Sequence, residues 1–519
     1  MYINNLFRRR ALKLTTYASK YIRKKNSKTD ADRKDLKSVV GLEIHAQLQS
    51  KSKLFSAAAN CFESAANTQV ALFDAAIPGT LPIINKKCVE AATLTALVLN
   101  CKLNTISLFD RKHYYYADMP AGYQITQQNL PLATNGQLSF YVVGENINKE
   151  IYSKTSFIKQ IQLEQDSGRL IHDDSSQTVL VDLNRAGLAL VELVFEPDLS
   201  DGLEASSLVK ELLLTFECIK TCSCKMEEGA LRVDANVSIS EGEQMGTRTE
   251  IKNLGSVRAV QSAVDYEIRR QLNLIKAGKE IINETRGWDS VLNKTISMRD
   301  KEVLQDYRFM PEPNLLPLNL NMIDVDKLQL SIPELPNATR KRLMQTYGFN
   351  IRKASILMNE PVLLKLFFQI MNEDSSRNPS RAWNIITIEL VAELNKINMK
   401  PVQCGISSNV IGEIVDLLDN GTLNLAYARK VIGELLQSVN KSATEIVIKN
   451  NWKQITNDSE ILKFCEEAMV EYPKAVKDYK KGKVKAIKAL IGSIAKKTNN
   501  RADLASVSKK LEELLKSNN

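Results

Sequence analysis

The stretch Val40-Gly41-Leu42-Glu43-Ile44-His45-Ala46-Gln47-Leu48 alternates apolar and polar residues, which predicts a β-strand with two unlike faces. We expect the apolar residues to face a core, which leaves Glu43, His45 and Gln47 on the other face. Side chains two positions apart on a strand lie about 6.5–7 Å from one another. A carboxylate and an imidazole at that spacing can bind the same divalent ion.

Three further segments repeat this alternation. The polar residues at alternate positions, which lie on one face of each predicted strand, are Gln160, Gln162, Glu164 and Asp166 in the first segment, Arg232, Asp234, Asn236 and Ser238 in the second, and Arg248, Glu250 and Lys252 in the third. An antiparallel sheet with one solvated face gives the same pattern. These segments, however, are rich in Glu, His, Asp, Arg and Asn, which bind metals and phosphates. Our hypothesis is one polar sheet face that forms a site of acidic and basic groups.

The composition is that of an ordinary globular protein. A length of 519 residues predicts about three or four domains. No apolar run reaches the roughly 18 residues of a transmembrane helix. The net charge of +10 and a pI near 9.0 favour an anionic partner such as nucleic acid.

The eight cysteines are scattered, which is typical of reduced thiols rather than of a disulfide scaffold. Cys218, Cys222 and Cys224 form a C-x3-C-x-C cluster without a fourth thiol or histidine close by in sequence. Zinc binding and simple thiols are the two interpretations of this cluster.

Residues 1–36 are rich in base and hydroxyl groups, with no acid before Asp30. This composition predicts a mitochondrial transit peptide, and a disordered basic tail is the alternative.

The middle of the chain mixes predicted helices, strands and loops. Helices are expected over 85–99, 203–219 and 256–276, and strands over 179–185, 188–195 and 231–239. Segments 110–124, 284–288 and 306–313 are expected to be loops. For 110–124 an aromatic-rich core strand is the alternative. Repeated prolines over 311–336 indicate a domain boundary.

Helical spacing replaces strand spacing beyond Pro336, as in 410–418 and 426–436, which predicts helical bundles up to residue 519. From Lys474 onward the chain has 13 Lys or Arg residues and four acidic residues. A solvated surface and a surface that binds an RNA backbone both explain this excess.

Phosphate-loop, dinucleotide-binding, zincin and hydrolase-elbow motifs are absent from the sequence. The acids and His45, with Arg and Lys beside them, suit Mg²⁺-assisted phosphoryl transfer. Acid/base hydrolysis of a glycosidic bond also uses paired carboxylates. The basic residues favour a phosphorylated substrate.

Several ordered motifs closely resemble the B subunit of the tRNA-dependent amidotransferase that acts on glutamyl-tRNA(Gln). They are Val-Gly-Leu-Glu-Ile-His (40–45), Asp-Arg-Lys-His-Tyr-Tyr-Tyr (110–116), Leu-Glu-Gln-Asp-Ser-Gly-Arg (163–169), Val-Asp-Leu-Asn-Arg-Ala-Gly (181–187), Lys-Met-Glu-Glu-Gly-Ala-Leu-Arg-Val-Asp-Ala-Asn (225–236), Glu-Ile-Lys-Asn-Leu (250–254) and Asp-Tyr-Arg-Phe-Met-Pro-Glu-Pro-Asn (306–314). The resemblance runs from about Val39 to the C-terminus and is densest up to Leu318. The archaeal relatives carry a large inserted domain for which this chain has no room.

The resemblance implies an α+β fold with a cradle-like domain built on an antiparallel sheet, then an all-α domain and a small helical tail. The expected boundaries are 1–36 for the transit peptide, 37–320 for the cradle, 331–450 for the helical domain and 451–519 for a tail domain that binds tRNA.

The resemblance also implies the chemistry. ATP with Mg²⁺ would phosphorylate the side-chain carboxylate of Glu-tRNA(Gln), and ammonia from glutamine would then displace phosphate to give Gln-tRNA(Gln). The implied partners are an A subunit that supplies ammonia, a small third subunit and the tRNA, in the mitochondrial matrix. A non-catalytic tRNA-binding scaffold is the alternative function.

The site residues follow from the matched motifs. The Mg²⁺ and catalytic cluster would be Glu43, His45, Glu164, Asp234 and Glu250, and the phosphate-binding residues would be Lys112, Arg185, Arg232 and Lys252. Gln165 departs from the family pattern, since bacterial relatives often have a second Glu there. An amide can still bind an ion but brings no charge, so weaker ion binding is expected.

Overall fold

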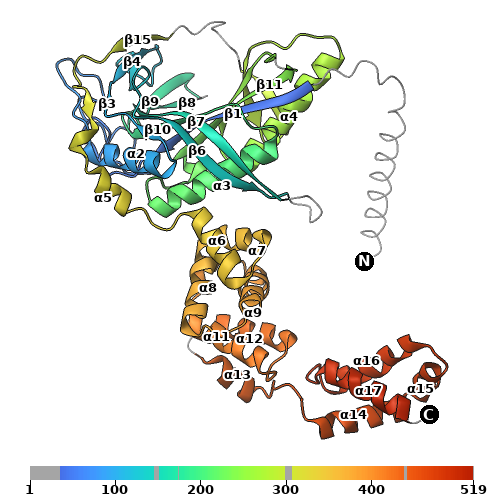
Figure 1. The fold of residues 1–519 in the computed structure, drawn as a ribbon. Helices are drawn as coiled ribbons and strands as arrows, with labels where there is room; N and C mark the ends of the chain where they lie inside the picture. The colour runs from blue at the N-terminus through green and yellow to red at the C-terminus, as the bar shows by residue number, and fades with distance from the viewer. Residues whose placement is uncertain are drawn as a thin grey trace. The chain divides into compact units, whose positions relative to one another are not determined.

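The computed structural model describes residues 36–144, 151–173, 175–242, 244–298, 307–437 and 441–517. These residues form two compact units, one up to Leu335 and one from Pro336 onward (Figure 1). The predicted transit peptide lies outside the described residues. The first unit mixes strands and helices and the second is helical, so the expected α+β class is confirmed.

A nine-stranded sheet organises the first unit. Its strands, in spatial order, are β14 (Lys294–Ser297), β13 (Thr285–Asp289), β12 (Thr249–Leu254), β11 (Leu231–Glu241), β1 (Leu36–Gln47), β10 (Ala189–Phe195), β7 (Tyr152–Gln165), β6 (Ala133–Val142) and β2 (Lys102–Leu103). All pairs are antiparallel except β12 with β13. The quoted stretch therefore lies in a central strand.

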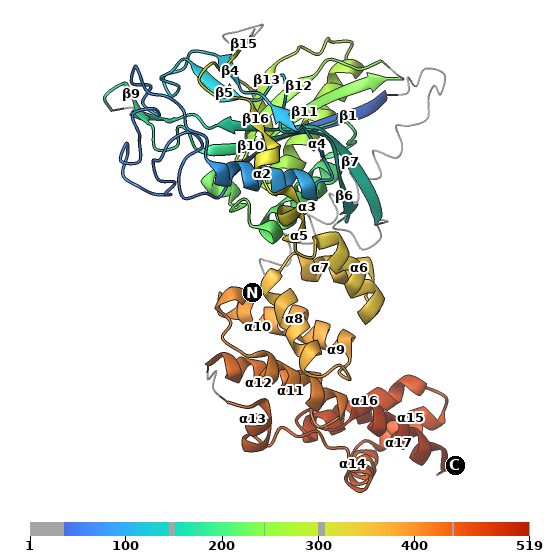
Figure 2. The ribbon, with the colours of Figure 1, turned by 60° about the vertical axis from the view of Figure 1, so that its left-hand side comes forward.

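The apolar side of this sheet is buried under three helices. They are α2 (Lys86–Val98), α3 (Gly202–Ile219) and α4 (Val257–Lys276). Leu42 and Ile44 of β1 lie in one core with Leu208 of α3 and Val260 of α4. Figure 2 shows α2 and α3 side by side next to β6 and β7. Because one face of the sheet is fully packed, the strand register is fixed. The polar side chains at the alternate positions of each strand must therefore face away from the helices.

Local sequence explains where the two long helices begin. The Asp201 carboxylate accepts a hydrogen bond from Glu204 N, and the Ser256 hydroxyl accepts one from Ala259 N. Each side chain satisfies an N–H group that a first helical turn leaves without a partner. The helices predicted over 203–219 and 256–276 are confirmed.

A separate small sheet corrects the prediction of loops. Its strands, in order, are β15 (Arg308–Pro311), β4 (Asp110–His113) and β5 (Tyr123–Thr126). The run Asp-Arg-Lys-His does not alternate in polarity, so it lacks the pattern that predicts a strand with one buried face. Its Arg111 forms a bidentate ion pair with Glu312. Segment 284–288 was likewise wrongly predicted as a loop, since β13 covers most of it.

The other short elements lie at the periphery of the first unit. They are the hairpin of β8 (Arg169–Asp173) and β9 (Thr178–Asp182), the pair β3 (Ile106–Ser107) and β16 (Leu318–Asn319), and α5 (Val325–Leu330). The strand predicted over 179–185 ends early, because a turn follows Asp182.

The second unit contains the predicted helices. They are α6 (Pro336–Tyr347), α7 (Ile351–Met358), α8 (Pro361–Glu373), α9 (Pro379–Asn384), the π-helical η3 (Ile385–Leu390), α10 (Val391–Lys396), α11 (Ser408–Asp419), α12 (Leu425–Gln437), α13 (Ala443–Lys449), α14 (Asp458–Glu471), α15 (Pro473–Lys480), α16 (Ile487–Lys497) and α17 (Leu504–Ser517). Proline occupies the first turn of α8, α9 and α15, where its missing N–H costs nothing. Helices α14, α16 and α17 share a core that includes Cys465, Leu490 and Leu511.

Among the described residues, no single helix has the length and apolar character needed to cross a membrane. Helices α7 and α8 meet that test only as a pair, and the pair bends by 113°.

The contact between α3 and α4 yields a stability prediction. A Cβ atom at Gly202 would overlap the carbonyl oxygen of Gln261, so Gly202→Ala must push the two helices apart. We expect a loss of about 1–3 kcal/mol in the free energy of unfolding, measured by urea denaturation. Gly255→Ala is the matched control, because its Cβ would meet nothing within 4 Å. Equal stability of the two variants would contradict this packing.

Candidate active site

The register of the central strands brings the polar residues together. Across the β1–β11 pair, Glu43 lies opposite Asp234, and His45 lies opposite Arg232. Across the β1–β10 pair, His45 lies opposite Glu192. Residues at facing positions have Cβ atoms about 4.5–5.5 Å apart. His45 is therefore flanked by a base on one side and an acid on the other.

His45, Glu164 and Glu192 form a compact cluster. His45 Nε2 lies 3.2 Å from Glu164 Oε1 and 3.8 Å from Glu192 Oε1. One potential ligand atom from each residue lies within 4.8 Å of the others. Both carboxylates are held in place, since Thr126 Oγ1 donates to Glu164 (3.2 Å) and Gln162 Nε2 donates to Glu192 (2.6 Å). An imidazole and two oriented carboxylates are a suitable ligand set for a divalent ion.

The pKa values in this cluster show how strongly its charges interact. Burial lowers the pKa of His45, but the carboxylates of Glu192 and Glu164 outweigh it and raise the value to about 9. For Glu192, burial and the charge of Glu164 raise the pKa to about 7. Burial opposes ionisation of Glu164 too, but His45 and Lys112 lower its pKa to about 2. Without a metal ion, protons therefore supply the positive charge that two buried carboxylates require.

Glu43, Asp234 and Glu250 form a second acidic group on neighbouring strands. Asn236 Nδ2 donates to Glu43 (3.0 Å), and Asp234 accepts from the backbone N–H of Asn253 (2.8 Å). Burial together with the charges of Asp234 and Glu43 raises the pKa of Glu250. Within the described residues these three acids do not join the close cluster around His45. They lie beside that cluster and add negative charge.

A cavity of about 410 Å³ opens on this face. Its lining includes His45, Glu164 and Asp234 from the large sheet, and Lys112, Arg232 and Lys252. Arg232 forms an ion pair with Asp166 at 2.8 Å, and its buried Nε has no hydrogen-bond partner among the described residues. With Asp118 and Asp166, which also line it, three cations and four acids share one cavity.

The small sheet and the segments beside it supply further lining residues of the cavity. Tyr114, Tyr116 and Tyr307 line it, and Lys112 Nζ lies 4.7 Å from the centroid of the Tyr307 ring. Aromatic rings beside ammonium groups suit a ligand with both a planar base and a phosphate chain.

Three expected site residues, Glu43, Arg185 and Glu250, do not line this cavity. The Arg185 guanidinium donates to the carbonyls of Ser167 (3.0 Å) and Gly168 (2.6 Å), and it lies 3.7 Å from Asp166. Arg185 thus supports the turn that carries Asp166. Glu250 also lies outside the lining and pairs with Lys252 at 3.8 Å.

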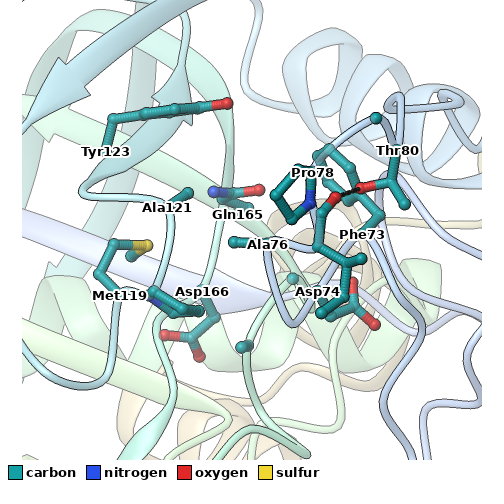
Figure 3. Close-up of a pocket in the computed structure, with 15 residues that line it drawn as sticks. Phe73, Asp74, Ala76, Pro78, Thr80, Met119, Ala121, Tyr123, Gln165 and Asp166 are labelled. Carbon is teal, nitrogen blue, oxygen red and sulfur yellow. Dashed lines mark hydrogen bonds between the residues drawn. The ribbon is translucent and has the colours of Figure 1, made fainter.

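A second pocket of about 300 Å³ adjoins the cavity at Asp166, which lines both (Figure 3). Figure 3 shows Asp74 and Thr80 on one side, Met119 and Tyr123 on the other, and Gln165 between them. Asp74 is held by an ion pair with the fully buried Lys53, whose Nζ lies 3.1 Å from Asp74 Oδ2. This ion pair holds the wall of the pocket in place.

Sequence reasoning did not identify Glu192 as a site residue. The strand around it reads Leu-Val-Glu-Leu-Val, so a single acid inside an apolar run was the available signal. A charged residue is rarely buried unless it is paired or binds a metal, and this rule would have identified it.

The cysteine cluster is not a metal site in the part of the chain that the structure describes. Among the described residues, the one group whose geometry could hold a metal ion is the His45 cluster, and the Cys218 thiol points to the carbonyl of Glu334, 3.3 Å away. Zinc binding by Cys218, Cys222 and Cys224 is therefore not supported.

Comparison with known proteins identifies the family. The model of the GatB/GatE catalytic domain matches residues 38–325, and that of the GatB domain matches residues 365–515. The chain belongs to the GatB/GatE family.

Within that family it is similar to proteins named as the B subunit of mitochondrial glutamyl-tRNA(Gln) amidotransferase. The Drosophila melanogaster relative is 48% identical over 93% of this chain and 95% of its own. For the Aedes aegypti relative the identity is 47%, covering 92% and 93%. For the Homo sapiens relative it is 44%, covering 92% and 88%. The resemblance found in the motifs is confirmed.

The charge balance around His45 can be tested by titration. In protein freed of divalent ions, we expect His45 to keep its proton at neutral pH and to lose it near pH 9. Glu192→Gln removes an attracting charge and should lower this pKa toward 6.5. NMR of histidine-labelled protein measures it, with His113 and His172 replaced by Gln so that one signal remains. Titration at or below pH 6.5 in the wild-type site would contradict the geometry.

Proposed function

We propose that this chain is the subunit that activates the glutamyl side chain of Glu-tRNA(Gln) with ATP and Mg²⁺, before ammonia converts it to the amide. The family comprises components of a ligase that amidates Glu-tRNA(Gln), and this part of the function follows from membership. The observation that carries the activation step is the convergence of His45, Glu164 and Glu192 beside Lys112, Lys252 and Arg232.

The residues present fit a magnesium ion. Two carboxylates and one imidazole provide mostly hard donors, and the raised pKa values of His45 and Glu192 show that the cluster lacks positive charge. His45, Glu164 and Glu192 would hold the ion, with Glu43 and Asp234 beside them. When bound, the ion neutralises phosphate charge and polarises the phosphoryl group.

The reaction then needs no covalent enzyme intermediate. A carboxylate oxygen of the substrate glutamyl group attacks the γ-phosphorus of ATP, ADP leaves, and an acyl phosphate forms. Ammonia attacks the carbonyl carbon of this acyl phosphate, and inorganic phosphate leaves with the shared oxygen. Such phosphoryl transfer depends mainly on positioning and charge neutralisation.

The basic residues of the cavity perform that neutralisation. Arg232, Lys112 and Lys252 carry positive charge into a site that is partly closed to water, where each interaction is stronger than in bulk solvent. Asp166 orients the Arg232 guanidinium, and Arg185 supports Asp166. Tyr114 and Tyr116 would stack on a nucleotide base.

The partners and the compartment follow from the same assignment. Ammonia must reach the acyl phosphate before water does, so we propose that an A subunit hydrolyses glutamine and supplies it. A small third subunit would complete the complex. The relatives are named mitochondrial, which supports a mitochondrial setting, and we place the reaction in the matrix.

The last helices provide a surface for the tRNA. Lys474, Lys477, Lys481, Lys485 and Lys488 are exposed on or next to α15 and α16. A row of exposed lysines attracts the phosphate backbone without reading its sequence.

Glu192 gives the sharpest test of the activation step. Glu192→Gln keeps the shape but removes one ligand charge, so ATP-dependent formation of Gln-tRNA should fall by at least about 100-fold. Glu196→Gln, just after the same strand and exposed, is the matched control. Both variants should bind Glu-tRNA normally in the reconstituted complex. Unchanged product formation by Glu192→Gln would leave a non-catalytic tRNA-binding scaffold as the function.

The tail makes a separate prediction. Replacing Lys474, Lys485 and Lys488 by Gln should weaken tRNA binding and reduce the slope of log affinity against log salt by about one for each phosphate that is no longer neutralised. Replacing Lys365 and Lys396 by Gln, in helices α8 and α10, is the control. An unchanged slope in the tail variant would mean that these lysines are only solvated.

A further inference from the structure

Two cysteines that the proposed mechanism does not use lie next to each other at the end of β1. Cys222 follows α3, and it forms an isolated β-bridge with Leu48, directly after the strand that carries His45. Cys222 is buried, and Cys224 is partly exposed. One residue therefore separates a buried cysteine from one that keeps some exposure to solvent.

The backbone around Cys222 forms a cradle for a negatively charged sulfur. Cys224 has a φ of +61°, a left-handed conformation that is uncommon for residues other than glycine. Cys224 N donates to Cys222 Sγ at 3.3 Å. A backbone N–H that points at a sulfur in this way stabilises its anionic form.

The two thiols also interact directly. The Cys224 thiol donates to the carbonyls of Leu213 (3.5 Å) and Cys222 (3.7 Å). Its interaction with the Cys222 sulfur lowers the pKa of Cys222 despite the burial of that residue. The same interaction and burial raise the pKa of Cys224, so of the two thiols Cys222 loses its proton more readily.

We propose that Cys222 and Cys224 are a reversible dithiol–disulfide pair, through which a small disulfide such as oxidised glutathione modifies the chain next to its catalytic strands.

The reaction balances as two thiol–disulfide exchanges. The Cys224 sulfur, after losing its proton to solvent, attacks one sulfur of oxidised glutathione, and a glutathione thiolate leaves. The Cys222 thiol then loses its proton and attacks the Cys224 sulfur of this mixed disulfide, and the second glutathione leaves. The protein loses two electrons and two protons, and one oxidised glutathione becomes two reduced ones. Cys222 suits the second role, because it is buried and its lowered pKa favours the thiolate.

The position of the pair links its oxidation to the site. Cys222 Sγ lies 3.5 Å from the carbonyl of Ala230, and the same carbonyl accepts a hydrogen bond from Gln47 N. Ala230 directly precedes β11, and Gln47 ends β1. Closing a disulfide must move Cys222 or Cys224, which disturbs the ends of the two strands that carry His45 and Arg232.

The chemical test uses the full chain in its complex, equilibrated with defined ratios of oxidised and reduced glutathione. After alkylation, we expect the peptide with both cysteines to lose two hydrogens and carry no glutathione. Cys222→Ser should instead accumulate one glutathione on Cys224, and Cys224→Ser should accumulate none on Cys222. Cys61→Ser, which removes an exposed cysteine elsewhere, should behave as wild type. Free thiols in the oxidised wild-type peptide, or a stable glutathione adduct there, would overturn the proposal.

A second readout concerns the catalytic strands. Oxidation should lower ATP-dependent amidation by the wild type at least several-fold, reduction should restore it, and Cys224→Ser should resist the oxidant. Equal losses in wild type and Cys224→Ser would overturn the link to the site. This readout rests on the proposed function, whereas the mass measurement does not, so failure of one can be told from failure of the other.

Discussion

The antiparallel pairing of β1 with β10 on one side and β11 on the other fixes where the charged side chains of the first unit lie. It sets His45 opposite Glu192 and Arg232, and Glu43 opposite Asp234. The apolar side chains at the alternate positions of the same strands pack against α3 and α4. A shift of the strand register by one residue would therefore bury the charged side chains and expose the apolar ones. The position of the site residues is therefore secured by the hydrophobic core.

The strand register holds the carboxylates of Glu164 and Glu192 close together although their negative charges repel each other. Glu164 is almost fully buried, and Glu192 lies beside it in the same cluster. Two such carboxylates are unfavourable without compensating positive charge. His45 provides part of it in the protein alone, and a divalent ion with the surrounding Lys and Arg side chains would provide it during turnover. Because the strands are rigid, these groups need little rearrangement when charge moves to phosphate.

Much of this could be predicted from sequence where alternation was long and regular. The faces of β1, β7 and β11, and the helices α3 and α4, follow from periodicity and caps alone. The small sheet could not be predicted, because Asp110 to His113 are four polar residues with no alternation, and β15, which pairs with them, lies about 200 residues further along the chain. Glu192 was missed because its strand is otherwise apolar, and only the three-dimensional register shows that it faces His45.

That Glu43, Asp234 and Glu250 group apart from the cluster around His45 could also not be predicted from the sequence, because it depends on the distances between strands. Site roles came from family motifs rather than from the pattern itself.

If the glutamyl carboxylate is phosphorylated before ammonia attacks, one oxygen of that carboxylate must leave with inorganic phosphate. Glu-tRNA(Gln) labelled with ¹⁸O in the side-chain carboxylate would be converted by the complex with ATP and glutamine, and the released phosphate analysed by mass spectrometry. We expect each product amide to be accompanied by one phosphate carrying a single ¹⁸O from the substrate. Phosphate free of label, with the ¹⁸O appearing in water, would rule out phosphorylation of the carboxylate.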